Sequence, residues 1–210
     1  ALQAGLANLA RHVANVRKFG VPAVVAINQF VTDTQAEHDL IRSYCQSELG
    51  VEAIVCSHWA NGSAGTEELA RFVAELADTP QPRNGRGFRH LYPDDMPLWT
   101  KMRTIATEIY GAADIIADKV VRDRFRELDE QGYGHFPICV AKTQYSFSTD
   151  PNLKGAPTGH VVPIREVRLS GGAEFLVVVC GEIMTMPGLP RQPAAHSIRL
   201  DTDGLIEGLF

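Results

Sequence analysis

Three absences narrow the function classes open to this 210-residue sequence. No apolar run approaches the roughly 20 residues that cross a bilayer, so we expect no membrane partner. The balance of 20 Lys and Arg against 25 Asp and Glu gives a net charge of -5, which argues against a nucleic-acid partner held through its phosphates. No lysine follows a glycine, so the phosphate loop G-x-x-x-x-G-K-[ST] is absent from the sequence.

Cysteine is also scarce, and the four that occur follow no metal-binding spacing. They are Cys45, Cys56, Cys139 and Cys180. Three of them lie in or beside apolar runs, which predicts buried free thiols. Their spacing fits no zinc pattern, and the isolated pair Cys56-x-His58 is too weak a signal for a metal site, so we expect no metal. The sequence has no signal-peptide pattern, and free thiols suit a cytoplasmic location.

The first half of the sequence alternates helix and strand patterns. Residues 2–18 predict an amphipathic helix. The chain starts inside this helix, with no initiator Met and no preceding strand, so we expect the C-terminal portion of a longer protein. Apolar runs at 22–27 and 51–56 predict buried parallel strands, and helices are expected at 33–49 and from Thr66 onward. This order predicts a mostly parallel sheet with flanking helices.

The second half predicts a smaller, mixed α/β unit. Residues 79–97 are rich in Pro, Gly and charge, which is typical of a connector. Beyond it we expect two helices, three strands with a hairpin at Gly171-Gly172, and an irregular C-terminal tail. The expected helices span 98–111 and 113–131, and the expected strands span 136–141, 161–169 and 175–180. The predicted fold class is therefore α/β, with domains at 1–80 and 98–210 joined by a connector at 81–97.

Two aromatic residues follow the two predicted strands of the first half. Phe30 comes just after the first strand and Trp59 just after the second. Ligands in open α/β sheets bind beyond the carboxyl ends of the strands, where two such rings could clamp a flat molecule. The alternative is that both are core residues that bridge the sheet and its helices, as most aromatic residues do.

A second group of polar residues follows the strand at 136–141. Five hydrogen-bonding side chains stand in a row from Lys142 to Ser146, and we single out Lys142 and Tyr145 as candidate active-site groups. The alternative is a turn whose side chains satisfy their own backbone. We assign no catalytic residue, because acid, base and nucleophile sets are defined by geometry that a sequence does not give.

Several stretches of this sequence together resemble formate–tetrahydrofolate ligase, in its C-terminal part. The matches keep their order and run from the first residue to the last. They are KFGVPAVVAINQFVTDT at 18–34, WANGSAGTEELA at 59–70, EIYGA at 108–112, FPICVAKTQYSFSTDP at 136–151, MTMPGLPRQPAA at 184–195 and GLF at 208–210.

The resemblance implies the ATP-dependent formation of 10-formyltetrahydrofolate from formate and tetrahydrofolate, through formyl phosphate. It implies that Phe30 and Trp59 stack on the pterin ring, and that Val31 and Val55 belong to the same folate site. Val31 stands where family members usually carry proline, which puts the rigidity of that turn in doubt. Glu182 also departs from the family pattern.

The resemblance also implies partners and cofactors. Tetrahydrofolate is the substrate, and ATP and magnesium are expected to bind mainly to an N-terminal domain that is not in this sequence. A homo-oligomer, typically a tetramer, is expected in the full enzyme. The alternative function is a non-catalytic α/β module kept for assembly or regulation. An NTPase domain is disfavoured because the phosphate loop is absent.

Overall fold

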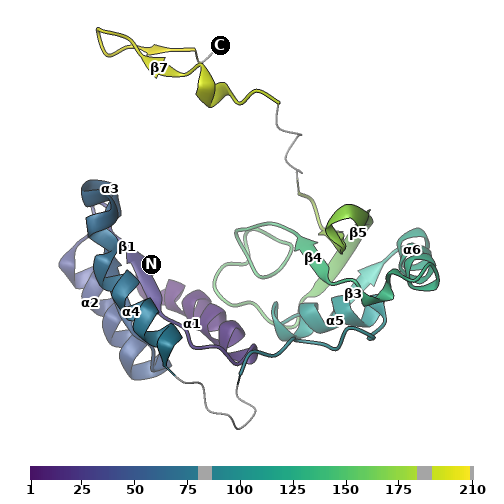
Figure 1. Cartoon of the computed structure of the whole chain (residues 1–210). Helices are drawn as coiled ribbons and strands as arrows, with labels where there is room; N and C mark the ends of the chain where they lie inside the picture. Colours follow the sequence, from purple (N-terminus) through teal and green to yellow (C-terminus); the bar gives the residue numbers. More distant parts are fainter. Residues whose placement is uncertain (80–86, 184–190, 209–210) are drawn as a thin grey trace.

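The computed structural model describes residues 1–79, 87–183 and 191–208, and its α/β architecture confirms the predicted fold class (Figure 1). The helices are α1 (Leu2–Lys18), α2 (Gln35–Tyr44), α3 (His58–Asn61), α4 (Glu67–Asp78), α5 (Leu98–Glu108) and α6 (Lys119–Glu130). The strands are β1 (Val25–Asn28), β2 (Ala53–Cys56), β3 (Asp114–Ala117), β4 (Ile138–Ala141), β5 (Val161–Ser170), β6 (Phe175–Cys180), β7 (Arg199–Leu200) and β8 (Ile206–Glu207).

The first lobe consists of α1 to α4 around a parallel pair of strands. β1 and β2 pair in parallel from Val25 opposite Ala53 to Asn28 opposite Cys56. Their core is small and contains buried apolar side chains from α1, both strands and the end of α2. β1 is less covered than expected, because Ala26 and Asn28 are exposed. In a strand whose side chains alternate between faces, this means that only one face of β1 is packed.

The start of α2 is fixed by a capping box. The backbone N–H and the hydroxyl of Thr34 both donate to Oε2 of Glu37, each over 2.9 Å. This arrangement satisfies a donor that the first helical turn leaves free. The helix then widens into one π turn at Cys45–Leu49 and ends at Gly50, whose φ of 58° favours glycine.

The second lobe contains a mixed sheet of four strands in the order β3-β5-β6-β4. β3 with β5 and β4 with β6 are parallel, and β5 and β6 form the expected antiparallel hairpin. The prediction of one helix over 113–131 is wrong at its start, because Asp114–Ala117 is strand β3 and α6 begins only at Lys119. The Asp118 side chain accepts from the N–H of Val121 and so sets that later start.

A buried lysine joins the start of α5 to the loop before β4. Lys101 is fully buried, and its Nζ donates to the carbonyl oxygens of Asp94, Gly134 and Phe136 at 2.7, 2.7 and 3.2 Å. An ammonium group can donate three hydrogen bonds, and these three carbonyl oxygens accept all of them. Lys101 therefore fastens the connector's end to the second lobe.

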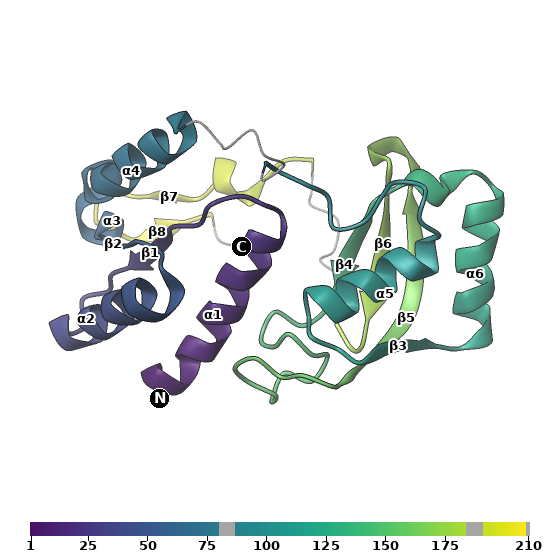
Figure 2. The same cartoon turned by 90° about the horizontal axis from the view of Figure 1, so that it is seen from below.

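Helix α1 lies between the two lobes (Figure 2). Its Asn8 and Asn15 amides each donate over 2.9 Å to carbonyl oxygens of the second lobe, at Gly155 and Ile109. Lys18 forms an ion pair with Glu108 at 3.0 Å. Helix α1 thus contacts both lobes, although the sequence assigns it to the first half.

The C-terminal tail carries a short antiparallel hairpin of β7 and β8. The stretches at 184–190 and 209–210, which carry part of the family resemblance, and residues 80–86 of the connector lie outside the described residues. Cys139 is exposed, so the expectation of buried thiols is wrong for that residue and holds for the other cysteines.

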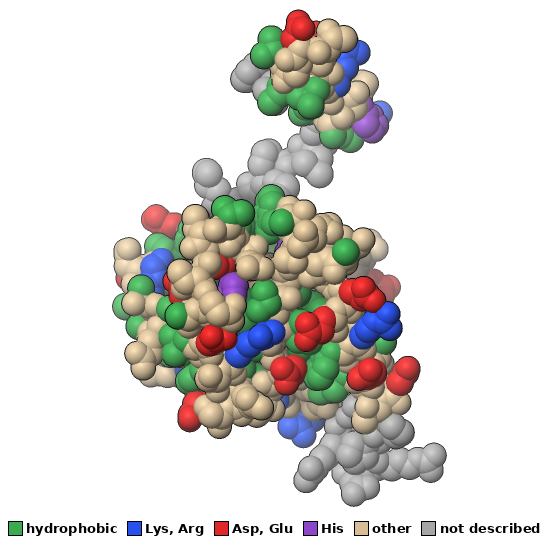
Figure 3. All heavy atoms as spheres, turned by 90° about the vertical axis from the view of Figure 1, so that its left-hand side faces the viewer, with side chains coloured by type: hydrophobic (Ala, Val, Ile, Leu, Met, Phe, Trp, Pro, Cys, Tyr) green, Lys and Arg blue, Asp and Glu red, His purple; other side chains and the backbone are tan. Residues whose placement is uncertain are grey.

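None of the helices in the described ranges combines the length and apolarity that a membrane crossing requires. On the face of the first lobe drawn in Figure 3, acidic and basic side chains are interspersed, with no concentration of basic ones.

Candidate functional site

The turns after β1 and β2 bring Phe30 and Trp59 together. The two strands are parallel neighbours in register, so their carboxyl ends meet at one edge of the sheet. The ring centroids lie 5.8 Å apart, and the ring planes are tilted by 38°. The sequence placed both residues at this edge, and the structure makes them neighbours.

Both rings are open to solvent. Phe30 is 50% exposed and Trp59 is 71% exposed, and Val31 beside them is 99% exposed. Within this chain the pair therefore does not belong to the core, since core aromatic residues are covered on both faces. The rings border a hollow of about 400 Å³ that we call the aromatic hollow. It is lined by Gln29, Phe30, Val31, Ser57, Trp59, Ala60 and Asn61.

The two rings lie too close together for a third flat ring to fit between their faces. A flat ring between two aromatic faces needs about 7 Å between them, because each contact takes about 3.5 Å. The 5.8 Å between centroids is too short for that. Both rings are largely exposed, so core packing does not fix their side-chain torsions.

Backbone bonds fix the turn that carries Phe30. The N–H of Gln29 donates to the Cys56 carbonyl at 2.9 Å and extends the pairing of the strands by one residue. The N–H of Phe30 donates to Oδ2 of Asp33 at 2.8 Å. Nε2 of the buried His38 lies 3.6 Å from the same oxygen. Asp33 therefore anchors the turn, as well as preceding the α2 cap.

The turn that carries Trp59 is held by a close approach of two backbone segments. The N–H of Ser57 donates to the carbonyl of Gly65 at 3.0 Å. A Cβ on Gly65 would lie 2.5 Å from the carbonyl carbon of Ser57, so this position requires glycine. Asn61 Nδ2 adds a bond to Ser57 Oγ at 2.9 Å. Trp59 is thus presented on a short α3 whose two ends are tied back.

The other residues assigned to the folate site differ in position. Val31 lines the aromatic hollow. Val55 is partly buried, packs against the first-lobe core, and is not among the residues that line the hollow. Gln29, Ser57 and Ala60 line it although sequence reasoning did not single them out; their place just after a strand end was the available signal.

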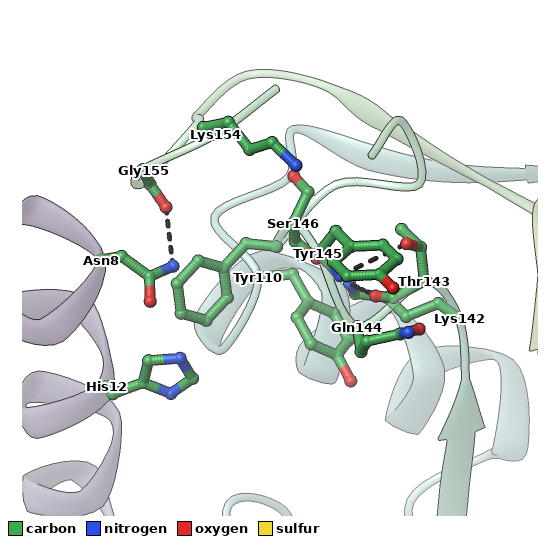
Figure 4. Close-up of a pocket in the computed structure, with 11 residues that line it drawn as sticks. Asn8, His12, Tyr110, Lys142, Thr143, Gln144, Tyr145, Ser146, Lys154 and Gly155 are labelled. Atoms are coloured by element: carbon green, nitrogen blue, oxygen red, sulfur yellow. Dashed lines mark hydrogen bonds between the residues drawn. The ribbon is translucent and has the colours of Figure 1, made fainter. Parts of the chain in front are cut away.

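Lys142 and Tyr145 lie in a second hollow, which shares no residue with the first (Figure 4). Lys142 Nζ donates to the carbonyl oxygens of Thr143, Ser146 and Ser148. Burial lowers the pKa of this ammonium group. The side chain thereby organises its own loop, and whether it also reaches a ligand stays a prediction.

The turn at Gly62–Thr66, which leads into α4, and the His and Cys residues in the described ranges form no further candidate site. The first turn of α4 carries Glu67 and Glu68, whose carboxylates already complement the positive end of the helix. No His, Cys, Asp and Glu side chains in the part of the chain that the structure describes form a group of three suited to a metal ion.

A family model and the similar known proteins carry the same description. The model of the family described as Formate--tetrahydrofolate ligase matches residues 1–210. Proteins of that name are 61% identical in Sinorhizobium medicae, 59% in Granulibacter bethesdensis and 60% in Cereibacter sphaeroides, each over the whole of this chain. The chain spans only 36 to 37% of the length of these relatives.

Proposed function

The chain belongs to the formate–tetrahydrofolate ligase family, and on this premise we propose that it supplies the pterin-binding side of an enzyme that makes 10-formyltetrahydrofolate. The observation that carries the proposal is the exposed pair Phe30 and Trp59. Two large aromatic faces left in solvent at the carboxyl edge of a parallel sheet are suited to a flat heterocycle.

The proposed reaction has two chemical steps. An oxygen of formate attacks the γ-phosphorus of ATP, which releases ADP and leaves formyl phosphate. N10 of tetrahydrofolate then attacks the formyl carbon, phosphate leaves, and the nitrogen loses its proton. The second step needs N10 to be held at a fixed place and angle, because orientation lowers the barrier of such an attack.

In this proposal the aromatic hollow supplies that orientation. Stacking on an aromatic side chain is worth about 1–3 kcal/mol per contact, by analogy with nucleobases. Val31 extends the apolar wall beside the rings, and Val55 supports β2 from the core side. The turns anchored at Asp33 and Gly65 limit how far the two rings can move.

We assign ATP, magnesium and formyl phosphate mainly to residues outside this chain. The chain has no Gly-Lys pair and therefore no phosphate loop of the common kind. On this basis we expect no turnover by these 210 residues alone. We further propose a cytoplasmic, homo-oligomeric full enzyme that acts on small molecules.

Calorimetric titration of tetrahydrofolate into this chain tests the proposal. We expect binding, and a loss of about tenfold or more in affinity for Trp59→Ala, which corresponds to one lost stack. Phe88→Ala is a matched control, because Phe88 is an exposed ring away from the aromatic hollow. Equal binding by wild type and Trp59→Ala would refute the pterin site. No binding by a folded wild type would mean either that the site needs residues outside this chain or that the chain serves a purpose other than catalysis.

A further inference from the structure

The second hollow, of about 380 Å³, lies where α1 meets the loop after β4 (Figure 4). We call it the junction hollow. One wall is α1 with Asn8 and His12, and another is the loop with Gln144, Tyr145 and Lys154. Its walls thus come from segments more than a hundred residues apart in the sequence.

The loop side of the junction hollow is built rigidly. Ser146 and Ser148 are buried, and their hydroxyl groups lie 2.9 Å apart. Ser146 Oγ also donates to the Leu153 carbonyl, and the Lys142 ammonium group binds carbonyl oxygens of the same loop. These bonds close the loop on itself, so the backbone from which its other side chains project is in place before any ligand arrives.

Several donors at the junction hollow are not engaged. Among the described residues, the Gln144 amide, the Tyr145 hydroxyl and the Lys154 ammonium group have no hydrogen-bond partner, although Lys154 Nζ lies 5.2 Å from the centre of the Tyr145 ring. Within the described ranges the Tyr110 hydroxyl also has no hydrogen-bond partner, and burial raises the pKa of Tyr110 to about 12, which keeps it a neutral donor.

The charge around the junction hollow is positive. No Asp or Glu is among the residues that line it. The carboxylate of Asp150, on the same loop, is outside the lining and accepts the N–H of Asn152 at 2.8 Å. Arg11 is outside the lining and lies 5.6 Å from the centre of the Phe147 ring. Burial first, and then Lys142 and Arg11, lower the pKa of the neighbouring His160, as expected in a positive field.

Rings are the other component of the lining. Tyr145 is an exposed ring, and Phe147 and Tyr110 lie deeper. A ligand that uses both the donors and the rings carries negative charge on a planar, apolar body, since planar apolar groups stack and anions accept from free donors.

We propose that the junction hollow binds the carboxylate of a small aromatic acid, with Lys154 and Tyr145 as its main contacts. The site is separate from the aromatic hollow, and its occupation does not depend on the function proposed above. Because its walls belong to α1 and to the second lobe, a bound acid bridges the two lobes.

The test uses benzoate as the probe and follows amide chemical shifts of the whole 210-residue chain. We expect saturable shifts at residues 143–155 and around His12, and no comparable shifts with benzamide, which has the same shape and no charge. Lys154→Gln should weaken benzoate binding roughly fivefold, as for loss of one solvent-exposed ion pair. Lys119→Gln, a change at an exposed lysine on α6, should leave it unchanged.

Three results would overturn the proposal. They are equal binding of benzamide, unchanged affinity in Lys154→Gln, and shifts that concentrate around Phe30 and Trp59. Tyr145→Ala provides an independent readout, because the side chain is exposed and its removal should not affect folding. If Tyr145→Ala binds benzoate as tightly as wild type, the ring has no role and the aromatic part of the proposal is wrong.

Discussion

The backbone N–H of Phe30 donates to the Asp33 side chain at 2.8 Å, so the position of an exposed ring depends on a carboxylate three residues later. The ring itself has few neighbours to hold it, because half of its surface is open. The anchor compensates for that lack of packing. The same oxygen of Asp33 lies 3.6 Å from Nε2 of the buried His38 on α2.

Removal of the hydrogen bond between Phe30 and Asp33 should weaken the binding of a pterin ligand without unfolding the chain. Loss of one hydrogen bond costs about 0.5–1.5 kcal/mol, so we expect Asp33→Ala to raise the dissociation constant for tetrahydrofolate roughly 2- to 10-fold. Calorimetry measures the change. Asp39→Ala is the control, since Asp39 is an exposed α2 residue whose carboxylate accepts from Gln35 at 2.8 Å. An Asp33→Ala variant that binds like wild type would show that the turn is held by other contacts.

The capping box of α2 should contribute to stability in a pH-dependent way. The bond from the Thr34 backbone N–H, and then the bond from its hydroxyl, lower the pKa of Glu37. A carboxyl whose pKa is lower in the folded state stabilises the fold above its unfolded pKa, about 4.3, and loses that contribution as the pH falls through the folded pKa.

We therefore expect Thr34→Ala to cost about 1 kcal/mol of unfolding free energy at pH 7, as for other cap removals. The difference from wild type should shrink as the pH falls below about 4, because Glu37 is then protonated in both proteins. Urea unfolding at the two pH values measures this. A difference that stays constant across the range would contradict the role of the Glu37 carboxylate.

Replacement of the buried Lys101 should be strongly destabilising. In Lys101→Met the carbonyls of Asp94, Gly134 and Phe136 lose their donor, and each unsatisfied buried group costs about 1–3 kcal/mol. We expect a loss of about 3 kcal/mol or more in thermal or urea unfolding. Lys119→Met, at a side chain that is 90% exposed, should change stability by less than about 0.5 kcal/mol. Similar stability of the two variants would refute the fastening role.

Only one of the four cysteines should react rapidly with a thiol reagent under native conditions. Cys139 is exposed, whereas Cys45, Cys56 and Cys180 are buried. Burial raises the pKa of Cys180 to about 12, so its reactive thiolate is scarce near neutral pH. A count of fast-reacting thiols in wild type and Cys139→Ser should give one and none. More than one fast thiol in wild type would mean that the strands open readily.

The sequence allowed the aromatic site to be predicted better than its surroundings. Phe30 and Trp59 follow strand-like runs, and the rule that parallel strands end at one edge is enough to place them together. The residues that anchor them are harder to find, since an aspartate before a helix and a glycine in a loop, like Asp33 and Gly65, are common wherever helices begin and chains turn. Strand β3 was missed because its four residues directly precede α6, and it exists through pairing with β5, which lies far along the chain.

The junction hollow was not predictable at all as a site. Lys142 and Tyr145 stood out as a polar cluster, but Asn8, His12 and Tyr110 come from elements whose contact with that loop depends on tertiary packing. Exposure is a further limit, because Cys139 lies in an apolar run that suggests burial, yet it is exposed on β4, a strand at the edge of its sheet.

The shared position of α1 has a consequence for how the chain can be divided. A cut between residues 79 and 98 separates two segments that each look like a unit in the sequence. It would also separate the second lobe from α1 and leave the Asn15 amide, which now donates to Ile109, without its acceptor. Each half expressed alone should therefore be less stable than it is in the intact chain. In the intact chain, movement of the second lobe should be transmitted through α1 to β1, the strand that presents Phe30.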